Sequence, residues 1–218
     1  MQPTDFYPET EEQLKNILTQ ARSQNIPVQP YAGGFNWGYG ETDTQSSRTW
    51  KIHFSKMRKI ISFDQDLGTL RIQPGVTQGD LEDYLKKNNL NYYVPNTGAG
   101  RRGSLLGNAL ERGFGIAPIQ DHANSLLAIQ GYLADGSVYK STLKWVDETL
   151  SECFAWGVGP QIDSLATQSS VIFISEVTIQ LVPKAPHTDL LIASFSDHEL
   201  PATIEVLRTL LQTNSGAI

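Results

Sequence analysis

The order of apolar and polar residues predicts a chain that mixes helices with strands. Apolar Leu14, Ile17 and Leu18 recur at helical spacing, and Thr10 is a suitable N-cap for the helix that contains them. Thr77 is placed in the same way ahead of a second helical pattern. Helices are therefore expected over 10–24, 78–88, 148–154 and 201–211, and strands over 26–30, 48–54, 60–63, 69–73, 127–133, 137–142, 171–181 and 190–195.

Short turns between these strands favour an α+β fold. Residues 64–68 and 134–136 are turn-forming and each joins two strand patterns into a hairpin. Hairpins that alternate with helices are typical of α+β proteins. Pro183 and Pro186 interrupt the pattern after the last long strand, so we expect one domain over 1–186 and the start of a second over 187–218. One strand and one helix cannot build a core of their own.

Composition and charge exclude several functional classes. The 218 residues are 39% hydrophobic and 18% charged, as in an ordinary globular protein, and the net charge of −6 disfavours nucleic acid as a partner. Cys153 is the only cysteine and the histidines lack ligand spacing, so no disulfide and no metal site are predicted. No segment resembles a signal peptide or a membrane span, which favours a cytoplasmic protein without a membrane partner.

Two glycine-rich segments carry the strongest functional signal. Gly103, Gly107, Gly113 and Gly115 recur within thirteen residues, and a second loop at 32–40 holds four glycines. Backbone without a Cβ atom can run close to a bulky ligand, and exposed amides suit phosphate oxygens. Two such loops could clamp one dinucleotide, with Pro74-Gly75 as a third approach. Neither segment matches a Walker A loop or a Gly-x-Gly-x-x-Gly fingerprint.

Titratable side chains follow the second segment, and each has an ordinary alternative role. Asp121 and His122 are candidates for chemistry, or else a cap aspartate and a partly exposed histidine. Tyr39 could polarise a phenol oxygen or pack among aromatic neighbours. Arg112 could contact a ligand or pair with an adjacent carboxylate. Arg101 and Arg102 could bind phosphate, although solvation is the simpler expectation.

Several separated motifs resemble one family. Pro30-Tyr-Ala-Gly-Gly-Phe-Asn-Trp-Gly-Tyr-Gly40, Ile72-Gln-Pro-Gly-Val-Thr77, the segment from Gly103 to Gly113, and Gly157-Val-Gly-Pro-Gln-Ile-Asp163 with Gln168-Ser169 are the motifs concerned. Over residues 6–186 the chain resembles the FAD-binding domain of the vanillyl-alcohol oxidase and p-cresol methylhydroxylase flavoproteins, and of the alkylphenol oxidases in particular. The resemblance implies an FAD-binding domain of two small α+β subdomains, followed by the first βα unit of a cap domain.

The resemblance also implies a cofactor site and a reaction. FAD would lie extended, and Phe35 stands where some relatives carry the histidine that attaches flavin, so the FAD should be non-covalent. Ile172 stands where the family usually has glycine, and its side chain could crowd the cofactor or be tolerated by a shift of the backbone. The implied cofactor-binding residues are Gly33, Gly34, Phe35, Asn36, Pro74, Gly75, Gly103, Ser104, Gly107, Asn108, Gly113, Asp121 and Ile174.

The implied chemistry is oxidation of a small phenolic substrate. Asp121 matches an aspartate near flavin N5, Tyr39 matches a tyrosine that stabilises a phenolate, and Arg112 completes the predicted catalytic set. Hydride would pass from a para-substituted phenol or related alcohol to FAD. Most of the cap is expected to lie outside this chain, so a cap-bearing subunit or a second copy would complete the site. The alternative is a non-catalytic relative that acts as a binding or interaction module.

Overall fold

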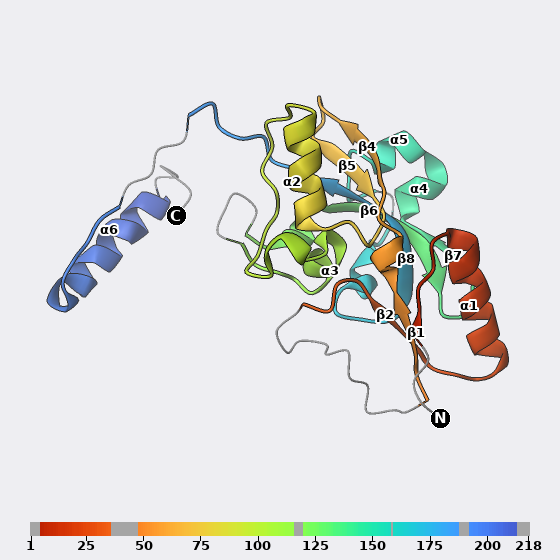
Figure 1. The fold of residues 1–218 in the computed structure, drawn as a ribbon. Coiled ribbons are helices and arrows are strands. Elements are labelled where there is room, and N and C mark those ends of the chain that lie inside the picture. The colour runs from red at the N-terminus through yellow and green to blue at the C-terminus, as the bar shows by residue number, and fades with distance from the viewer. Residues whose placement is uncertain (1–4, 36–47, 116–119, 158, 188–191, 213–218) are drawn as a thin grey trace.

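Two β-sheets form the body of the protein. The computed structural model describes residues 5–35, 48–115, 120–157, 159–187 and 192–212. Within these residues, a three-stranded parallel sheet has the order β1-β3-β2, and a five-stranded antiparallel sheet has the order β4-β5-β8-β6-β7 (Figure 1). Helices and hairpins are interspersed between the strands, which confirms the predicted α+β class.

Helix α1 joins the small sheet to the large one. The small sheet contains β1 (Asp5–Phe6), β2 (Val28–Tyr31) and β3 (Trp50–His53). Helix α1 (Glu11–Ser23) begins after Thr10, whose hydroxyl accepts a hydrogen bond of 3.2 Å from the Gln13 amide, as predicted. Fully buried Leu14 and Leu18 pack with Ile52 of β3 and Phe173 of the large sheet in one cluster. The two sheets therefore share a core.

Both predicted hairpins are present in the large sheet. Strands β4 (Ile60–Asp64) and β5 (Thr69–Ile72) form one, and β6 (Leu126–Leu133) and β7 (Val138–Lys140) form the other. Strand β8 (Ile172–Gln180) lies between β5 and β6. The predicted strand 137–142 is too long, because helix α4 (Thr142–Val146) begins within it. Helix α5 (Glu148–Ser151) is shorter than its predicted range.

A bulge in β8 shifts the alternation of its side chains, so that apolar residues before and after it join one core cluster. Glu176 pairs with Gln130 but Ile174 pairs with Gly131, so Ser175 is an extra residue on β8. Ile172 and Ile174 before the bulge then share a core cluster with three residues after it, Val177, Ile179 and Leu181. A side chain at residue 131 would clash with the Phe173 carbonyl, so this close crossing requires glycine.

Two helices cover the face of the large sheet that carries this cluster. Helix α2 (Gln78–Lys87) begins with a capping box in which Thr77 and Asp80 exchange side chain to backbone hydrogen bonds. It buries Leu81 and Leu85 beside helix α3 (Leu105–Leu110), and Figure 1 shows the two helices next to each other. The expectation of a loop throughout 98–115 is therefore wrong, since six of its residues are helical.

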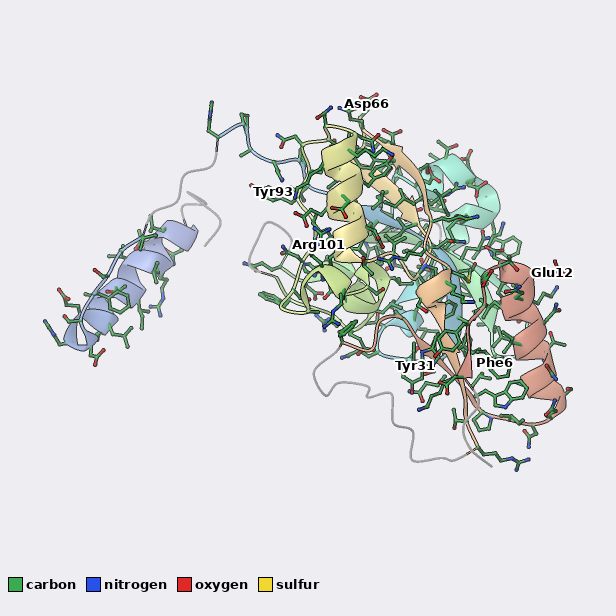
Figure 2. All side chains as sticks on the ribbon, viewed as in Figure 1. Phe6, Glu12, Tyr31, Asp66, Tyr93 and Arg101 are labelled. Atoms are coloured by element: carbon green, nitrogen blue, oxygen red, sulfur yellow. The ribbon has the colours of Figure 1, made fainter. Side chains whose placement is uncertain are left out.

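The C-terminal helix stands apart from the body. Helix α6 (Leu200–Gln212) follows a short 3₁₀ turn, and Figures 1 and 2 show it and its side chains well separated from the two sheets. The strand predicted over 190–195 is absent from residues 192–195; residues 190 and 191 lie outside the described chain. Pairing with the body continues through the predicted linker as far as Lys184, whose amide donates to Asn91. Of the helices described, none has the length and apolar character needed to cross a membrane.

Candidate functional site

A wide cavity of about 720 Å³ lies where the predicted ligand loops meet. The loop after β2 forms one wall, α3 and the turn after it form another, and Gln168 closes the end nearest β8. A volume of this size is typical of small-molecule sites. The predicted site residues that line it are Gly33, Gly34, Phe35, Gly103, Ser104, Gly107, Asn108, Arg112, Gly113 and Asp121.

Two further cavities adjoin the wide one and hold the other described candidates. The inner cavity, about 370 Å³, shares Ala32 and Gly107 with the wide cavity and adds Pro74 and Ile174. The outer cavity, about 420 Å³, shares Gly33 and Ser104 with it and adds Gly75. The fold thus gathers candidates that are far apart in sequence. Asn36 and Tyr39 lie outside the described residues.

Four residues with open backbone amides line the wide cavity, and three of them also line the outer cavity. The amides of Gly33, Gly34, Phe35 and Ser104 donate no hydrogen bond to an acceptor within the described residues. A Cβ atom placed on Gly33 would lie 3.5 Å from the Ser104 nitrogen, so the two loops approach closely there. The Ser104 hydroxyl donates to the Pro74 carbonyl at 2.9 Å and fixes the second loop. Convergent free amides are the arrangement that binds phosphate oxygens.

The other glycine-rich segment uses its amides within the protein. Gly107 donates to the Ser104 hydroxyl at 3.0 Å, Asn108 to the Ser104 carbonyl, and Gly113 to the Asn108 carbonyl at 2.8 Å. Gly103 donates to the Gly100 carbonyl at 3.0 Å. These residues line the cavity, but their amides already donate to protein acceptors, so they would contact a ligand through other atoms. The amides of Gly107 and Asn108 have protein acceptors because these residues belong to α3.

Several glycines here allow protein segments, not a ligand, to approach. A Cβ atom on Gly107 would lie 3.0 Å from the Cβ atom of Ala32, so α3 packs directly against the loop after β2. A Cβ atom on Gly75 would clash with the carbonyl oxygen of Phe54 and lie 2.7 Å from that of Met57. Glycine at both positions sets the distance between the walls of the cavity.

Asp121 and Arg112 form an ion pair at one side of the wide cavity. Arg112 Nη2 lies 2.6 Å from Asp121 Oδ2, and the Ala123 amide donates to Asp121 Oδ1 at 3.1 Å. The hydrogen bond from Arg112 is the main reason that the pKa of the Asp121 carboxyl lies below its usual range. Asp121 therefore carries a charge at neutral pH and can accept hydrogen bonds. It also caps a short 3₁₀ helix (His122–Ser125), as its alternative role predicted.

His122 is a buried structural neighbour of the cavity. Only 2% of its surface is exposed, so the expected partly exposed histidine is wrong. Its Nδ1 atom lies 2.5 Å from Asn108 Nδ2, and its amide donates to the Gly113 carbonyl at 3.0 Å. A Cβ atom on Gly115 would lie 2.7 Å from His122 Nε2. His122 thereby ties α3 to the segment that carries Asp121.

Ile172 does not crowd the described cavities. It is buried in the core cluster of the large sheet, whereas Ile174, two residues further along β8, lines the inner cavity. Of these two residues, only Ile174 is among those that line the described cavities. Apolar Leu106 and Leu110 of α3 lie on the same cavity wall as Ile174. This wall suits a flat, apolar ring.

Glu111, Gln168 and Ser169 are among the lining residues that were not predicted. Glu111 lines both the wide and the inner cavity, and burial raises the pKa of its carboxyl. Gln168 and Ser169 line the inner cavity, and the Gln168 amide is anchored to the Leu110 carbonyl at 3.0 Å. All three belong to the motifs that carry the family resemblance, which was the signal available for finding them. In the described part of the chain, no group of three or more His, Cys, Asp and Glu side chains could hold a metal ion.

The fold and these cavities define a known class of cofactor-binding domain. A family model described as "FAD binding domain" matches residues 4–142, which is more than half of the chain. The chain belongs to this FAD binding domain family. The match covers the loop after β2, the Pro74-Gly75 turn and the whole of α3.

Curated relatives extend the likeness over almost the whole chain. This chain is 27% identical over 208 residues to the flavoprotein subunit of 4-cresol dehydrogenase [hydroxylating] from Pseudomonas putida. The match covers 94% of this chain and 40% of the relative. The chain is 27% identical over 210 residues to 1'-carboxy-chondrochloren decarboxylase from Chondromyces crocatus, covering 95% of this chain and 39% of the relative. The chain thus spans about two fifths of the length of these relatives.

Solved structures confirm the fold. A structure of p-cresol methylhydroxylase with substrate bound superposes with a TM-score of 0.84 at 27% identity, covering 96% of this chain and 41% of that one. A 4-ethylphenol oxidase from Gulosibacter chungangensis superposes with a TM-score of 0.83 at 24% identity and supports the fold alone. The predicted resemblance to the p-cresol methylhydroxylase group is confirmed.

Proposed function

We propose that this chain binds FAD non-covalently in the three adjoining cavities and forms the FAD-binding part of an oxidoreductase. The observation that carries the proposal is that Gly33, Gly34, Phe35 and Ser104, whose amides are open within the described residues, all line the wide cavity. The chain has a net charge of −6, so an anionic group must be held by local donors of this kind. Membership of the FAD binding domain family supplies the identity of the ligand.

Different walls of the cavities would bind different parts of such a cofactor. The four open amides would donate to the pyrophosphate. Leu106, Leu110 and Ile174 of the inner cavity would pack against an aromatic ring system. Glu111, for which the described residues show no hydrogen-bond donor, would accept hydrogen bonds from sugar hydroxyls. Asn108, Gly113 and His122 would hold the wall in place through the contacts described above.

The proposed reaction is oxidation of a para-substituted phenol or a related alcohol. FAD, when bound, supplies the capacity to accept a hydride, and O2 or an electron carrier would reoxidise it. Asp121 would accept a hydrogen bond near the reactive end, and Arg112 keeps it ionised. The phenolic class is supported by the relative named for 4-cresol. The decarboxylase at the same identity shows that relatives of this likeness differ in their named reaction.

We also propose that residues 187–218 begin a second unit and that a larger assembly completes the active site. Exposed apolar side chains on α6, among them Ile204 and Val206, leave it without a packed partner in the described chain. A cap-bearing subunit or a second copy of this chain would cover it. The named relative is itself one subunit of an enzyme.

A visible absorption spectrum tests the cofactor proposal directly. The purified protein is recorded before FAD is added, and again after FAD addition and desalting. Retained flavin bands, released into the supernatant by acid, would show a non-covalent cofactor. The proposal fails if no flavin is retained and a hundredfold excess of FAD over the expected Kd gives none of the roughly 2.7 kcal/mol of stabilisation that binding requires. The non-catalytic binding module would then be the better description.

A further inference from the structure

One cation beside the open amides, Arg102, has no carboxylate partner in the part of the chain that the structure describes. Among the arginines whose contacts the structure describes, Arg22, Arg58, Arg71, Arg101, Arg112 and Arg208 each lie within ion-pair distance of an aspartate or glutamate. Arg48 has an interaction of its own. Arg102 has no acidic partner within the described residues. Its guanidinium instead lies over the ring of Phe35, 4.8 Å from the centroid.

The position of Arg102 is set by the same loops that present the open amides. Arg102 lines the outer cavity together with Gly33, Phe35 and Ser104. A Cβ atom on Gly33 would lie 3.6 Å from the Arg102 carbonyl oxygen, so the two backbones are in contact. The stacked Phe35 ring restricts where the guanidinium can lie. Arg102 is therefore held near the amides before any ligand binds.

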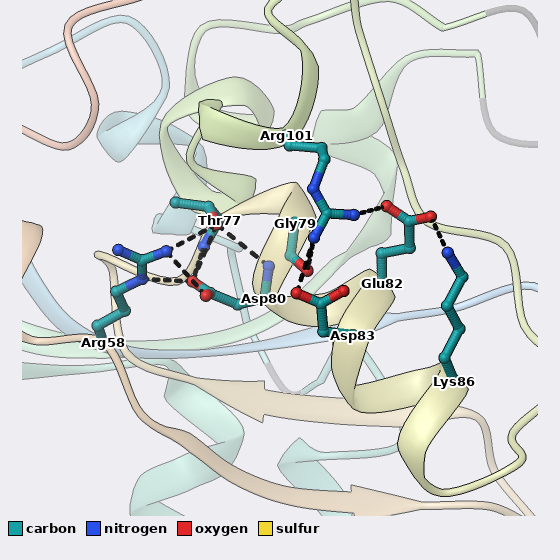
Figure 3. A network of polar contacts seen from close by, with 8 residues as sticks. All are labelled: Arg58, Thr77, Gly79, Asp80, Glu82, Asp83, Lys86 and Arg101. Atoms are coloured by element: carbon teal, nitrogen blue, oxygen red, sulfur yellow. Dashed lines mark hydrogen bonds and ion pairs between the residues drawn. The ribbon is translucent and has the colours of Figure 1, made fainter.

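Its neighbour Arg101 is engaged in a different way. Figure 3 shows the Arg101 guanidinium between Glu82 and Asp83 of α2, and Glu82 also pairs with Lys86. Arg58, on the same cavity wall, pairs with Asp80 at 2.5 Å. The two aspartates that line the outer cavity are thus matched by Arg58 and Arg101, and the charge of Arg102 is left over.

We infer that Arg102 is a phosphate-binding side chain, which pairs with a phosphate group of the dinucleotide held by the amides of Gly33, Gly34, Phe35 and Ser104. This inference rests on the proposed function. A planar guanidinium beside free amides matches the several oxygens of a phosphate, and charge-assisted bonds are stronger than those from neutral amides. Phe35 contributes to this site because its ring packs against the guanidinium of Arg102.

Two matched variants test the inference. Arg102→Met keeps an apolar stem over Phe35 but removes the charge, and Arg101→Met makes the same change at the neighbouring, paired arginine. Both arginines are exposed, so both variants should fold. The dissociation constant of FAD is measured for the wild type and both variants between about 0.1 M and about 1 M NaCl, over which the Debye length falls from about 10 Å to about 3 Å.

Arg102→Met should weaken FAD binding about tenfold or more and flatten its salt dependence, while Arg101→Met stays within about twofold of the wild type. Arg102→Lys should restore much of the salt dependence. The inference is overturned if Arg102→Met binds FAD as the wild type does, if its salt dependence is unchanged, or if Arg101→Met loses as much. A wild-type protein that binds no FAD would instead overturn the proposed function, so the two failures are distinguishable.

Discussion

The loop 32–35 and the segment 103–113 are both glycine-rich and line the same cavity, but they use glycine differently. In the first, Gly33 and Gly34 line the cavity and their amides donate to no acceptor among the described residues. In the second, Gly107 and Gly113 donate their amides within the protein and stand against other protein atoms. A glycine-rich segment therefore indicates that something lies close to its backbone. Only the hydrogen bonds of its amides show whether that neighbour is protein or a ligand.

A substitution at Gly113 should have the largest effect, and the effect should fall on the fold. A Cβ atom there would clash with the Asn108 side chain and lie 2.9 Å from the Asn108 carbonyl oxygen. Backbone cannot rotate away as a flexible side chain can, so Gly113→Val should lower the free energy of unfolding by about 3 kcal/mol. Urea unfolding monitored by circular dichroism measures this. Unchanged stability would show that the segment 103–113 tolerates a larger side chain. The proposed difference between this segment and the loop 32–35 would then be wrong.

A substitution at Gly33 should have nearly as large an effect, but on the ligand. The nearest atoms to its Cβ position are Phe35 Cδ2 at 3.2 Å and the Ser104 nitrogen at 3.5 Å. Gly33→Val would place methyl groups in front of the open amides and should weaken FAD binding about a hundredfold, or about 2.8 kcal/mol. FAD titration followed by fluorescence gives the constant, and urea unfolding serves as the control. Gly33→Ala should show a smaller loss, because its Cβ contact with Ser104 is an ordinary one.

Gly107 tests the link between the two segments. Its Cβ position lies 3.0 Å from the Cβ atom of Ala32, so Gly107→Val should push α3 away from the loop that carries Gly33 and Gly34. FAD binding should weaken about tenfold, or about 1.4 kcal/mol, although the Gly107 amide itself faces protein. The same titration measures this. Full flavin retention in a folded Gly107→Val protein would show that the loop does not depend on α3.

The parts of the fold that the sequence predicts best have strong local signals. The apolar stripe of α1 with its Thr10 cap, and the Thr77 cap of α2, need no knowledge of the rest of the chain. Helix α3 was missed because Gly103, Gly107 and Gly113 are typical of loops, and glycine in a helix costs about 1 kcal/mol relative to alanine. Burial of Leu105, Leu106 and Ala109 in the core offsets that cost, and only the tertiary structure shows it.

The candidate site, too, has features that local motifs predict and features that depend on the tertiary structure. Motifs predicted which segments meet, since Gly33, Ser104, Asn108 and Asp121 all line one cavity. They did not predict the burial of His122, or the bulge at Ser175 that sets the faces of β8, because both depend on neighbours distant in sequence. The strand expected over 190–195 had a suitable composition, yet residues 192–195 pair with no strand in the described chain. Composition indicates a strand only where a partner is available.

Removing Arg112 should have the smallest effect, a small loss of stability at neutral pH that disappears at acidic pH. Because the pKa of Asp121 is lowered in the folded protein, its ionised form stabilises the fold above the ordinary carboxyl pKa of about 3.9, and this contribution is lost as the pH falls through the lower folded-state value. Arg112→Ala removes the main cause of the lowering, so the Asp121 pKa should rise towards its ordinary value. The variant should then be slightly less stable than the wild type at neutral pH and should lose less stability as the pH falls. Thermal unfolding between about pH 3 and about pH 7, with the Asp121 pKa followed by NMR, measures both.

A matched control is available for this variant. Arg208 pairs with Glu205 at 2.8 Å and has the same 60% side-chain exposure as Arg112, but it belongs to α6, which Figure 1 shows apart from the body. Arg208→Ala should leave the Asp121 pKa unchanged. If Arg112→Ala also leaves it unchanged, the amide of Ala123 must be sufficient to hold the carboxylate ionised, and Arg112 would be free to contact a ligand, as its sequence position first suggested. If the Asp121 pKa rises, Arg112 acts through Asp121. The segment after α3 would then contribute a charged side chain to the cavity, whereas the loop after β2 contributes open amides.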